Sequence, residues 1–248
     1  MHRILIVGGA NGIGLSMAKA LDERASTERI HIVDKAPLRP GILSDKAEAH
    51  QFDLTAADYT FFDRFTDIDT LIITAGFGRL ALFRDIPEEQ IAAYFGVNTI
   101  PAIRLIRRFY PRLEASDTFR CGVMVSIAGY MSSPFFSLYG ATKAALRIFI
   151  ESVNVELEKA GSPNRILNVS PGSIQGTAFS GGETDLTATR PLAEDILARL
   201  DAGDDLFIPQ YDEVFREVLQ RAHDDFRREG LHSYDYKLQR LNPSPLDS

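Results

Sequence analysis

The sequence predicts an α/β fold in which a doubly wound parallel sheet of about seven strands carries helices on both faces. Short apolar runs rich in Ile, Leu and Val alternate with longer segments of helical periodicity along most of the chain. Several of the apolar runs are continuous rather than alternating, as expected for strands that are covered on both sides. The alternation of the two patterns indicates βαβ units, which form parallel sheets through right-handed crossovers.

Six runs are predicted strands and five segments are predicted helices. The strands are residues 4–7, 30–33, 71–74, 123–126, 165–169 and 205–209. The helices, whose apolar residues recur at spacings of three and four, are residues 13–24, 92–113, 141–160, 192–200 and 213–230. Neither an internal repeat nor a linker rich in Pro, Gly and Ser divides the chain. We therefore expect a single domain over residues 1–248, with a substrate loop at about 178–190 and a C-terminal helix at about 213–230.

Composition and charge are those of an ordinary globular protein. The chain has 248 residues, 45% of them hydrophobic, and a formal net charge of −7. The acidic excess disfavours nucleic acids and anionic membranes as partners. The N-terminal apolar run is too short for a signal peptide, so we expect a cytoplasmic location by default. The one cysteine, Cys121, is predicted to be a small buried residue of a strand.

A glycine-rich turn lies between the first predicted strand and the first predicted helix. It contains Gly8, Asn11, Gly12, Ile13 and Gly14. Such a turn brings backbone N–H groups and a helix N-terminus to one point, where a pyrophosphate can bind. The turn therefore predicts a dinucleotide site in a Rossmann-like sheet. A glycine turn of purely structural kind is the alternative.

Asp34 ends the second predicted strand, 20 residues after Gly14. A carboxylate at this spacing accepts hydrogen bonds from the ribose hydroxyls of NAD and repels the 2′-phosphate of NADP. The sequence thus favours NAD(H) over NADP(H), although Lys35 beside Asp34 offers a charge that suits a phosphate. A surface aspartate without this role is the alternative.

Tyr139 and Lys143 lie four residues apart at the start of a predicted helix, on one face. A nearby ammonium favours the phenolate and lowers the pKa of a tyrosine, which makes it suitable for acid–base catalysis. Ser126 ends a predicted strand and would point into the crevice at the carboxyl edge of the sheet. There its hydroxyl can donate to a developing oxyanion. A surface pair and a turn serine are the alternatives.

The order of these motifs resembles the short-chain dehydrogenase/reductase superfamily, specifically its single-domain type, over about residues 1–210. The matching segments are VGGANGIG (7–14), FDLT (52–55), Thr74-Ala75-Gly76, GVNT (96–99), Ser126 with Tyr139 and Lys143, and Pro171-Gly172-Ser173-Ile174. The resemblance implies an NAD-dependent oxidoreductase that interconverts a secondary alcohol and a ketone.

The resemblance also implies roles for individual residues. The implied catalytic set is Asn98, Ser126, Tyr139 and Lys143, with Tyr139 as the acid–base, Ser126 orienting the substrate oxygen and Lys143 lowering the tyrosine pKa. Asn98 would complete a proton relay and position the lysine. The implied cofactor-binding set is Gly8, Asn11, Gly12, Ile13, Gly14, Asp34, Asp53, Leu54, Ala75, Gly76, Tyr139, Lys143, Pro171 and Ile174.

Three positions depart from the family pattern. Val7 and Thr74 replace polar residues that tie the cofactor turn to the fourth strand, so we expect weaker local scaffolding. Thr177 lies one residue later than the family threonine, which leaves its cofactor contact an open question. The C-terminal sequence also differs from that of the fatty-acid-synthesis reductases, so the resemblance predicts no particular substrate.

Several large apolar residues near the predicted site suggest an apolar substrate pocket, with ordinary core packing as the alternative. They are Phe77, Met131, Phe135, Phe136 and Phe179, of which Phe135 and Phe179 are the best candidates. The five histidines show no spacing typical of a metal site, so the sequence predicts none. The helices 92–113 and 141–160 resemble those that pair between subunits in the superfamily, which implies a homodimer or homotetramer.

Two other functions remain open. The chain could be a non-enzymatic NAD-binding regulator on the same fold, although such a protein has no use for all four catalytic side chains. It could also dehydrate or epimerise a sugar nucleotide, which the absence of an extra substrate domain disfavours.

Overall fold

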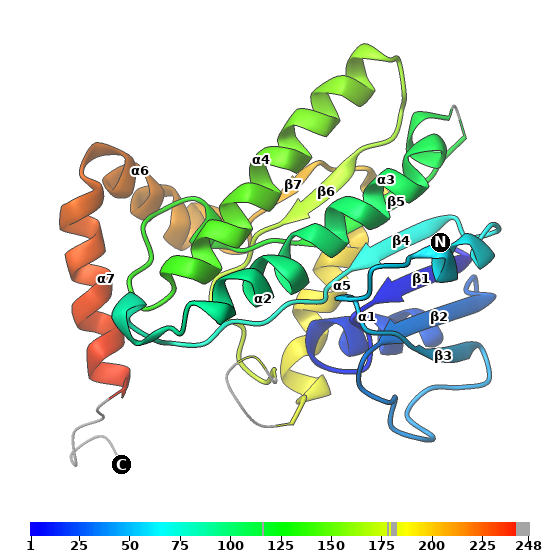
Figure 1. Cartoon of the computed structure of the whole chain (residues 1–248). Helices are drawn as coiled ribbons and strands as arrows, with labels where there is room; N and C mark the ends of the chain where they lie inside the picture. The colour runs from blue at the N-terminus through cyan, green and yellow to red at the C-terminus, as the bar shows by residue number, and fades with distance from the viewer. Residues whose placement is uncertain (116, 178, 180–182, 242–248) are drawn as a thin grey trace.

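A computed structural model describes residues 1–115, 117–177, 179 and 183–241 (Figure 1). Seven strands form one parallel sheet in the order β3-β2-β1-β4-β5-β6-β7, which confirms the predicted fold class. The strands are β1 (Arg3–Val7), β2 (Arg29–Asp34), β3 (Ala47–Gln51), β4 (Thr70–Ile73), β5 (Arg120–Met124), β6 (Ile166–Val169) and β7 (Leu206–Phe207). The order reverses between β1 and β4, and the crevice at such a point binds ligands in open α/β sheets.

Helices cover both faces of the sheet. They are α1 (Gly12–Asp22), α2 (Glu89–Asn98), α3 (Ile100–Glu114), α4 (Ser137–Lys159), α5 (Leu186–Ala202), α6 (Arg216–Asp224) and α7 (Phe226–Leu241). α1 and α5 pack on one face, whereas α3 and α4 pack on the other. In the described part of the chain, no helix is long and apolar enough to cross a membrane.

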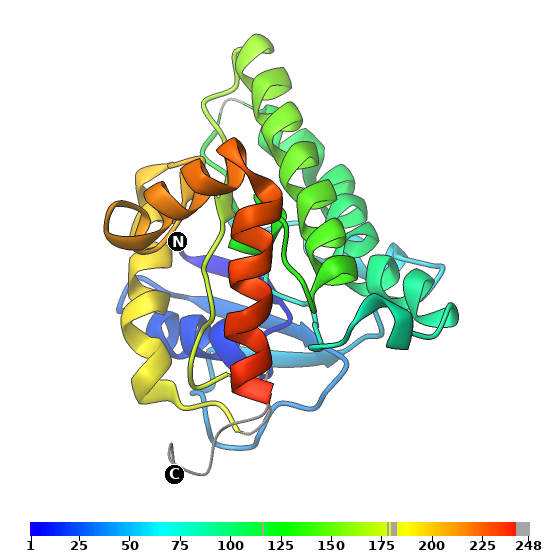
Figure 2. The ribbon, with the colours of Figure 1, turned by 90° about the vertical axis from the view of Figure 1, so that its left-hand side faces the viewer.

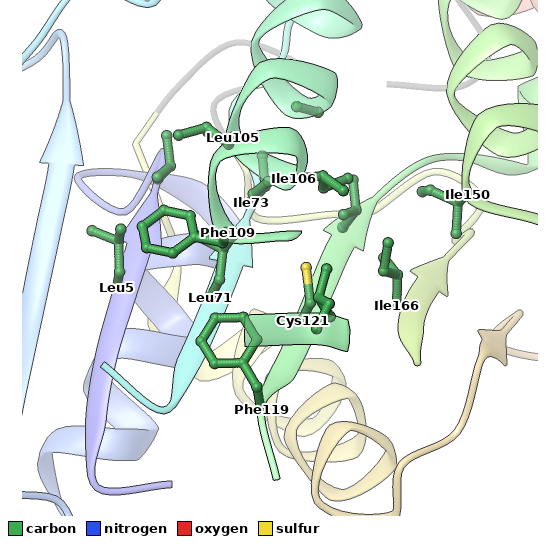
Figure 3. Close-up of a cluster of buried hydrophobic side chains, with 14 of the residues drawn as sticks. Leu5, Leu71, Ile73, Leu105, Ile106, Phe109, Phe119, Cys121, Ile150 and Ile166 are labelled. Carbon is green, nitrogen blue, oxygen red and sulfur yellow. The ribbon is translucent and has the colours of Figure 1, made fainter. Parts of the chain in front are cut away.

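The continuous apolar run of β1 divides its side chains between two cores. Leu5 and Val7 join the core beneath α3 and α4, whereas Ile4 and Ile6 join the core beneath α1 and α5. Side chains of a strand alternate between faces, so a strand buried on both sides needs apolar residues at every position. Figure 3 shows the first of these cores, with Cys121 among its aliphatic and aromatic neighbours. Burial raises the pKa of the Cys121 thiol to about 12, which fits the predicted role as a small core residue.

The strand β3 is missing from the sequence prediction. Its sequence, AEAHQ, has neither a continuous apolar run nor β-branched residues, and none of its side chains is fully buried. It lies at the edge of the sheet, where it has a neighbouring strand on one side only. Edge strands of this kind carry little hydrophobic signal.

The predicted helix 92–113 is two helices. α2 ends at Asn98, and Thr99 leaves helical geometry at φ −123° before Pro101 opens the first turn of α3. The Thr99 hydroxyl donates to the carbonyl of Thr142 in α4 at 2.9 Å. The break thus fixes the end of α2 against α4, which is where Asn98 must be held if it is to meet the predicted site.

The predicted C-terminal helix 213–230 is also broken, and the structured chain continues beyond it. A π-helical turn, Tyr211–Phe215, leads into α6, and Asp225 separates α6 from α7. The Asp225 carboxylate accepts from the N–H groups of Arg227 and Arg228, at 3.1 and 3.0 Å, and so caps α7. Charged periodicity continues across this cap, which is why the sequence pattern does not show the break. Figure 2 shows α7 in front of the sheet, between α4 and α5.

Candidate functional site

The glycine turn packs directly against the end of the neighbouring strand β4. Gly8 has φ +93°, and a Cβ at this position would lie 2.4 Å from the Ala75 nitrogen. A Cβ at Gly14 would lie 2.4 Å from the Gly8 carbonyl oxygen. Both positions therefore require glycine, one for its backbone conformation and both for the close approach. This packing places Ala75 and Gly76 beside the N-terminus of α1.

Thr74 ties the turn to β4. Its hydroxyl donates to the Gly8 carbonyl oxygen at 2.8 Å. The expectation of weaker scaffolding from Thr74 is therefore wrong, because a threonine hydroxyl reaches the same backbone from this strand end. Val7 is fully buried in the core and stabilises the turn through packing.

We predict that Gly8→Ala destabilises the chain by at least about 2 kcal/mol, from unfavourable φ and from the clash with Ala75. Gly96→Ala is the matched control, because Gly96 is interior to α2 and its added Cβ meets nothing within 4 Å. That change should stabilise the chain by about 0.5–1 kcal/mol. Urea unfolding of both variants measures the difference. Equal stability of the two variants would contradict the described turn.

The N-terminus of α1 offers backbone donors that a pyrophosphate could use. The Gly12 N–H donates to the Thr184 hydroxyl at 2.6 Å, and the Asn11 side chain makes no capping bond among the described contacts. Thr177 is buried next to Gly12, and its hydroxyl donates to the Ile174 carbonyl oxygen at 3.1 Å. A phosphate oxygen at the Gly12 N–H would take the place of the Thr184 hydroxyl. No sequence motif points to Thr184, because it lies 172 residues from Gly12.

Asp34 lies at the same turn. Its carboxylate accepts from the N–H of Ala10 and from the N–H of Ala36, each at 3.0 Å. The remaining lone pairs of the carboxylate are suited to accept from ribose hydroxyls. The structure thus brings Asp34 to the glycine turn, where the sequence places it.

Asp53 follows β3 and pairs with Lys35. The Lys35 amine lies 2.9 Å from one carboxylate oxygen, and Thr55 donates twice to the other. These bonds lower the pKa of Asp53 to about 2, with the Lys35 hydrogen bond the largest cause. Leu54 packs against the core beneath α3 and α4. The positive charge of Lys35, which would suit a 2′-phosphate, is engaged by Asp53.

Asn98 links three parts of the site. Its side chain accepts from the Phe77 N–H at 2.8 Å and donates to the Phe77 carbonyl at 2.9 Å. It also donates to the Thr142 hydroxyl at 3.2 Å. A Cβ on Gly76 would lie 3.3 Å from the Asn98 amide oxygen and 3.4 Å from the Lys143 amine. Asn98, Gly76 and Lys143 therefore meet, as the resemblance implies.

Tyr139 and Ser126 also come together. Ser126 follows β5, is 8% exposed, and its hydroxyl accepts from the Ala128 N–H at 3.2 Å. Burial raises the pKa of Tyr139 to about 12, while a hydrogen bond with the Ser126 hydroxyl lowers it. Tyr139 is thus a protonated phenol at neutral pH, in contact with a second hydroxyl.

Lys143 is buried beside the tyrosine ring. Its amine donates to the Met124 carbonyl oxygen at 2.8 Å and lies 5.7 Å from the centre of the Tyr139 ring. Burial lowers the pKa of Lys143 to about 8. The net shift of the Tyr139 pKa is therefore opposite to the expected acidification, because burial raises the phenol pKa and also disfavours the charged form of the Lys143 amine.

Aromatic rings lie over Tyr139. Its ring centre is 5.5 Å from that of Phe136 and 5.3 Å from that of Phe179. A Cβ on Gly78 would lie 2.6 Å from the Phe179 ring, so this glycine leaves room for it. These rings form an apolar wall beside Tyr139, which suits the predicted apolar pocket.

Two other candidate pocket residues have packing roles. Phe77 packs on Tyr94, with ring centres 4.5 Å apart. Phe135 is 6% exposed and packs on Tyr234 of α7 at 4.8 Å. Phe136, and not Phe135, therefore joins Phe179 beside Tyr139. Phe135 and Phe136 both lie between Ser126 and Tyr139 in the sequence, so their sequence position alone does not show which of them lies beside Tyr139.

Helix α7 holds the segment that precedes Tyr139. The Lys237 amine donates to the Ser133 hydroxyl at 2.7 Å and to the Pro134 carbonyl at 2.9 Å. The same amine lies 5.4 Å from the centre of the Phe136 ring. Burial lowers the pKa of Lys237 to about 8. A contact between segments so far apart in the chain leaves no periodic signal, so sequence reasoning missed it.

Pro171 and Ile174 follow β6, next to the turn that follows Ser126. The Pro171 carbonyl accepts from the Ile127 N–H at 3.0 Å, and Ile174 packs against the core beneath α1 and α5. The strand ends that carry Ser126 and Pro171 are therefore tied together. The backbone after Pro171 lies where a nicotinamide carboxamide could bind if the ring reached Tyr139.

Comparison with known proteins gives the family of the chain. The family model described as short chain dehydrogenase matches residues 2–185. The chain belongs to this family. This chain is 30% identical over 178 residues to the uncharacterized oxidoreductase YvrD of Bacillus subtilis. The match covers 68% of this chain and 67% of that protein. The chain is 26% identical over 240 residues to human 17-beta-hydroxysteroid dehydrogenase type 1, covering 89% of this chain and 70% of the human protein.

Solved structures share the fold of this short-chain dehydrogenase. A short chain dehydrogenase of Burkholderia cenocepacia in complex with NADP has a TM-score of 0.74 and 24% identity, covering 94% of this chain and 96% of that one. A short chain dehydrogenase/reductase of Burkholderia phymatum in complex with NAD has a TM-score of 0.73 and 17% identity. The match covers 92% of this chain and 95% of that one. Both cofactors therefore occur among proteins of this fold.

Proposed function

We propose that this short-chain dehydrogenase transfers a hydride between NAD(H) and a secondary alcohol or ketone. One observation carries the proposal. Ser126, Tyr139 and Lys143 meet at the carboxyl edge of the sheet, and Asn98 joins them through Gly76. This is the place where a doubly wound sheet binds its ligand.

Each catalytic side chain has one task in the proposal. Tyr139 exchanges a proton with the substrate oxygen, and Ser126 donates to the same oxygen and orients it. Lys143 stabilises the phenolate that forms when Tyr139 has given up its proton. Asn98 holds the Phe77 backbone and the Gly76 region in place beside Lys143. The nicotinamide supplies and accepts the hydride when it is bound.

The cofactor would lie along the glycine turn. The pyrophosphate would take the N–H groups of Asn11, Gly12, Ile13 and Gly14. Gly8 would shape the turn that the pyrophosphate lies on, since its own N–H donates to the Val33 carbonyl oxygen at 2.8 Å. The adenosine half would lie near Asp34, Asp53 and Leu54. The nicotinamide half would lie among Ala75, Gly76, Tyr139, Lys143, Pro171 and Ile174. The tight packing of Gly8 against Ala75 supports this path, because the turn and the β4 end form one continuous edge.

The protonated state of Tyr139 suits the proton-donating step of ketone reduction. A phenol whose pKa burial raises to about 12 keeps its proton throughout the neutral range and is ready to donate it to a carbonyl oxygen.

A preference for NAD(H) over NADP(H) rests on two charges. Asp34 presents a carboxylate at the turn, and the Lys35 amine is paired with Asp53 at 2.9 Å. The 2′-phosphate of NADP would be repelled by the carboxylate of Asp34, and the Lys35 amine, paired with Asp53, would not compensate for this repulsion.

Asp34→Ala should reduce the ratio of kcat/KM for NADH to kcat/KM for NADPH by about tenfold or more, since the repulsion of the 2′-phosphate is removed. Steady-state rates with each cofactor measure the ratio. Asp45→Ala, which removes an exposed acidic residue of the surface, is the control and should leave the ratio unchanged. An unaltered ratio in Asp34→Ala would show that Asp34 does not set the preference.

The proposed substrate is a small molecule with an apolar, ring-bearing body. The rings of Phe136 and Phe179 beside Tyr139 support this. Two similar proteins are named 17-beta-hydroxysteroid dehydrogenase and sepiapterin reductase, and both names denote ring compounds. Nucleic acids and membranes are not part of the proposal.

The proposal includes a cytoplasmic single-domain protein, residues 1–248, that assembles as a homodimer or homotetramer. Apolar side chains exposed on α3 and α4 support the assembly: Ile100 is 50%, Ile148 52% and Val155 68% exposed. Apolar residues on the two helices would be covered if these helices paired between subunits.

A panel of apolar cyclic and acyclic ketones, with NADH and absorbance of the reduced nicotinamide, tests the function. Oxidation of NADH with at least one ketone is the expected result. Tight NADH binding without turnover of any ketone or alcohol would instead favour the non-enzymatic regulator.

A further inference from the structure

His31 lies on β2, and Glu48 and His50 lie on β3, where the three side chains come together. β3 is an edge strand of the sheet (Figure 1). The two strands pair in parallel with His31 opposite Glu48 and Val33 opposite His50. Residues directly opposite each other share a face, and so do residues two apart on one strand. The register therefore places all three side chains together, although the residues of β3 are 17 and 19 positions from His31 in the sequence. The prediction of no metal site rests on sequence spacing, which does not encode this register.

The donor atoms are spaced as a metal would require. His31 Nδ1 lies 3.2 Å from His50 Nε2, and the Glu48 carboxylate oxygens lie 3.6 Å from His31 Nδ1 and 3.7 Å from His50 Nε2. Donors bound at about 2.0–2.2 Å to one tetrahedral ion stand about 3.3–3.6 Å apart. The oxygen near His31 is Oε2 and the one near His50 is Oε1, so a rotation of the Glu48 carboxylate that brings one oxygen toward both nitrogens would complete such a triad.

In the alternative arrangement, a hydrogen bond joins the two imidazoles, and the half-exposed Glu48 carboxylate is hydrated by water. A neutral imidazole has one N–H and one lone pair. If His31 donates to His50 across the 3.2 Å gap, the lone pair of His50 faces both that proton and the Glu48 oxygen at 3.7 Å. A dication would use all three donors at once.

Aromatic rings hold the imidazoles in place. Phe65 lies 5.0 Å from His31 and 5.4 Å from His50 between ring centres, and Phe61 lies 6.0 Å from His50. The imidazole side chains are only 16% and 13% exposed, whereas that of Glu48 is 52% exposed. The triad is thus packed on the protein side and open to water on the other, which leaves room for a fourth ligand.

Positive charges surround the triad, and of these Arg3 is paired with acidic side chains. Arg3 is paired with Glu28 at 3.0 Å and with Asp67 at 3.4 Å. Arg64 lies over the Phe61 ring at 4.3 Å. The triad lines a surface cavity together with Arg29 and Arg64. Their positive charges oppose a cation, so the affinity for a metal must come from coordination.

We propose that His31, Glu48 and His50 bind a first-row transition-metal dication, with Zn²⁺ favoured by two imidazoles and one carboxylate, and with water as the fourth ligand. The ion would fasten the edge strand β3 to β2 just ahead of the segment that contains Asp53. The site lies apart from Tyr139 and is not needed for hydride transfer.

Titration of the full-length chain, free of any polyhistidine tag, with Co²⁺ and then Zn²⁺ tests the site. We expect one equivalent of Co²⁺ to give the intense visible absorption of a tetrahedral ion, and Zn²⁺ to displace it. His50→Gln and Glu48→Gln should each weaken Zn²⁺ binding at least about tenfold in calorimetry. His232→Gln is the matched control, because His232 is 78% exposed and lies 3.9 Å from Glu229 outside the triad.

A pale octahedral Co²⁺ spectrum, or Zn²⁺ affinity that survives both substitutions, would overturn the proposal. Glu48→Gln keeps the test valid if His50→Gln fails to fold, because the Glu48 side chain is half exposed and its loss leaves the strand core intact. Neither readout depends on enzyme activity.

Discussion

Tyr139→Phe should lower kcat for ketone reduction by about 10²–10⁴-fold, while NADH still binds. The change removes only the phenol oxygen, which is the proposed proton donor. The rings of Phe136 and Phe179, which pack on Tyr139 at 5.5 and 5.3 Å, keep their partner. Steady-state kinetics with the ketone chosen from the panel, and NADH fluorescence titration, give the two quantities.

The matched control for this prediction is Tyr130→Phe. Tyr130 follows the same strand as Ser126, and its hydroxyl accepts from the Asn168 amide at 2.9 Å. Loss of that hydroxyl should alter stability slightly and leave kcat near its original value. Near-normal turnover by Tyr139→Phe would remove Tyr139 from the role of acid.

Ketone reduction should slow as pH rises through about 8. Burial lowers the pKa of Lys143 to about 8 and raises that of Tyr139 to about 12. Below pH 8 the amine is charged and can stabilise the phenolate left by proton donation. Above it the charged fraction falls about tenfold per pH unit, while Tyr139 still holds its proton, so kcat falls. A pH–rate profile from about pH 6 to about pH 10 measures this.

Lys237 offers the necessary control, because burial lowers its pKa to about 8 as well. Lys237→Met removes that amine, which lies beside Phe136 and contacts Ser133 and Pro134. The decline near pH 8 should persist in this variant. Its disappearance would assign the titration to Lys237 and not to Lys143.

The fold and most of the candidate site follow from local sequence. The apolar run of β1 and the glycine turn after it are signals that a single segment carries. Ser126 follows a strand end, and Tyr139 and Lys143 lie in the first two turns of α4. Parallel strands bring such ends to one edge of the sheet. Their convergence is therefore predictable from the sequence.

Features that depend on pairing between distant segments could not be predicted. β3 has no hydrophobic pattern, so the meeting of His31 with Glu48 and His50 depends on a register that spacing does not encode. The hydrogen bond from the Lys237 amine to the Ser133 hydroxyl joins residues that are 104 positions apart in the sequence. The pKa of Tyr139 could not be predicted from the sequence for a related reason: burial, which raises it, depends on the whole fold and not on the spacing of Tyr139 and Lys143.

A crystal structure of the chain with NADH and the selected ketone tests the central claim most directly. We expect the Tyr139 hydroxyl within about 2.6–3.2 Å of the ketone oxygen and the nicotinamide C4 about 3–3.5 Å from the carbonyl carbon. We also expect the pyrophosphate on the Gly12 N–H in place of Thr184. A nicotinamide ring bound away from Tyr139, with the ketone held by other groups, would contradict the central claim.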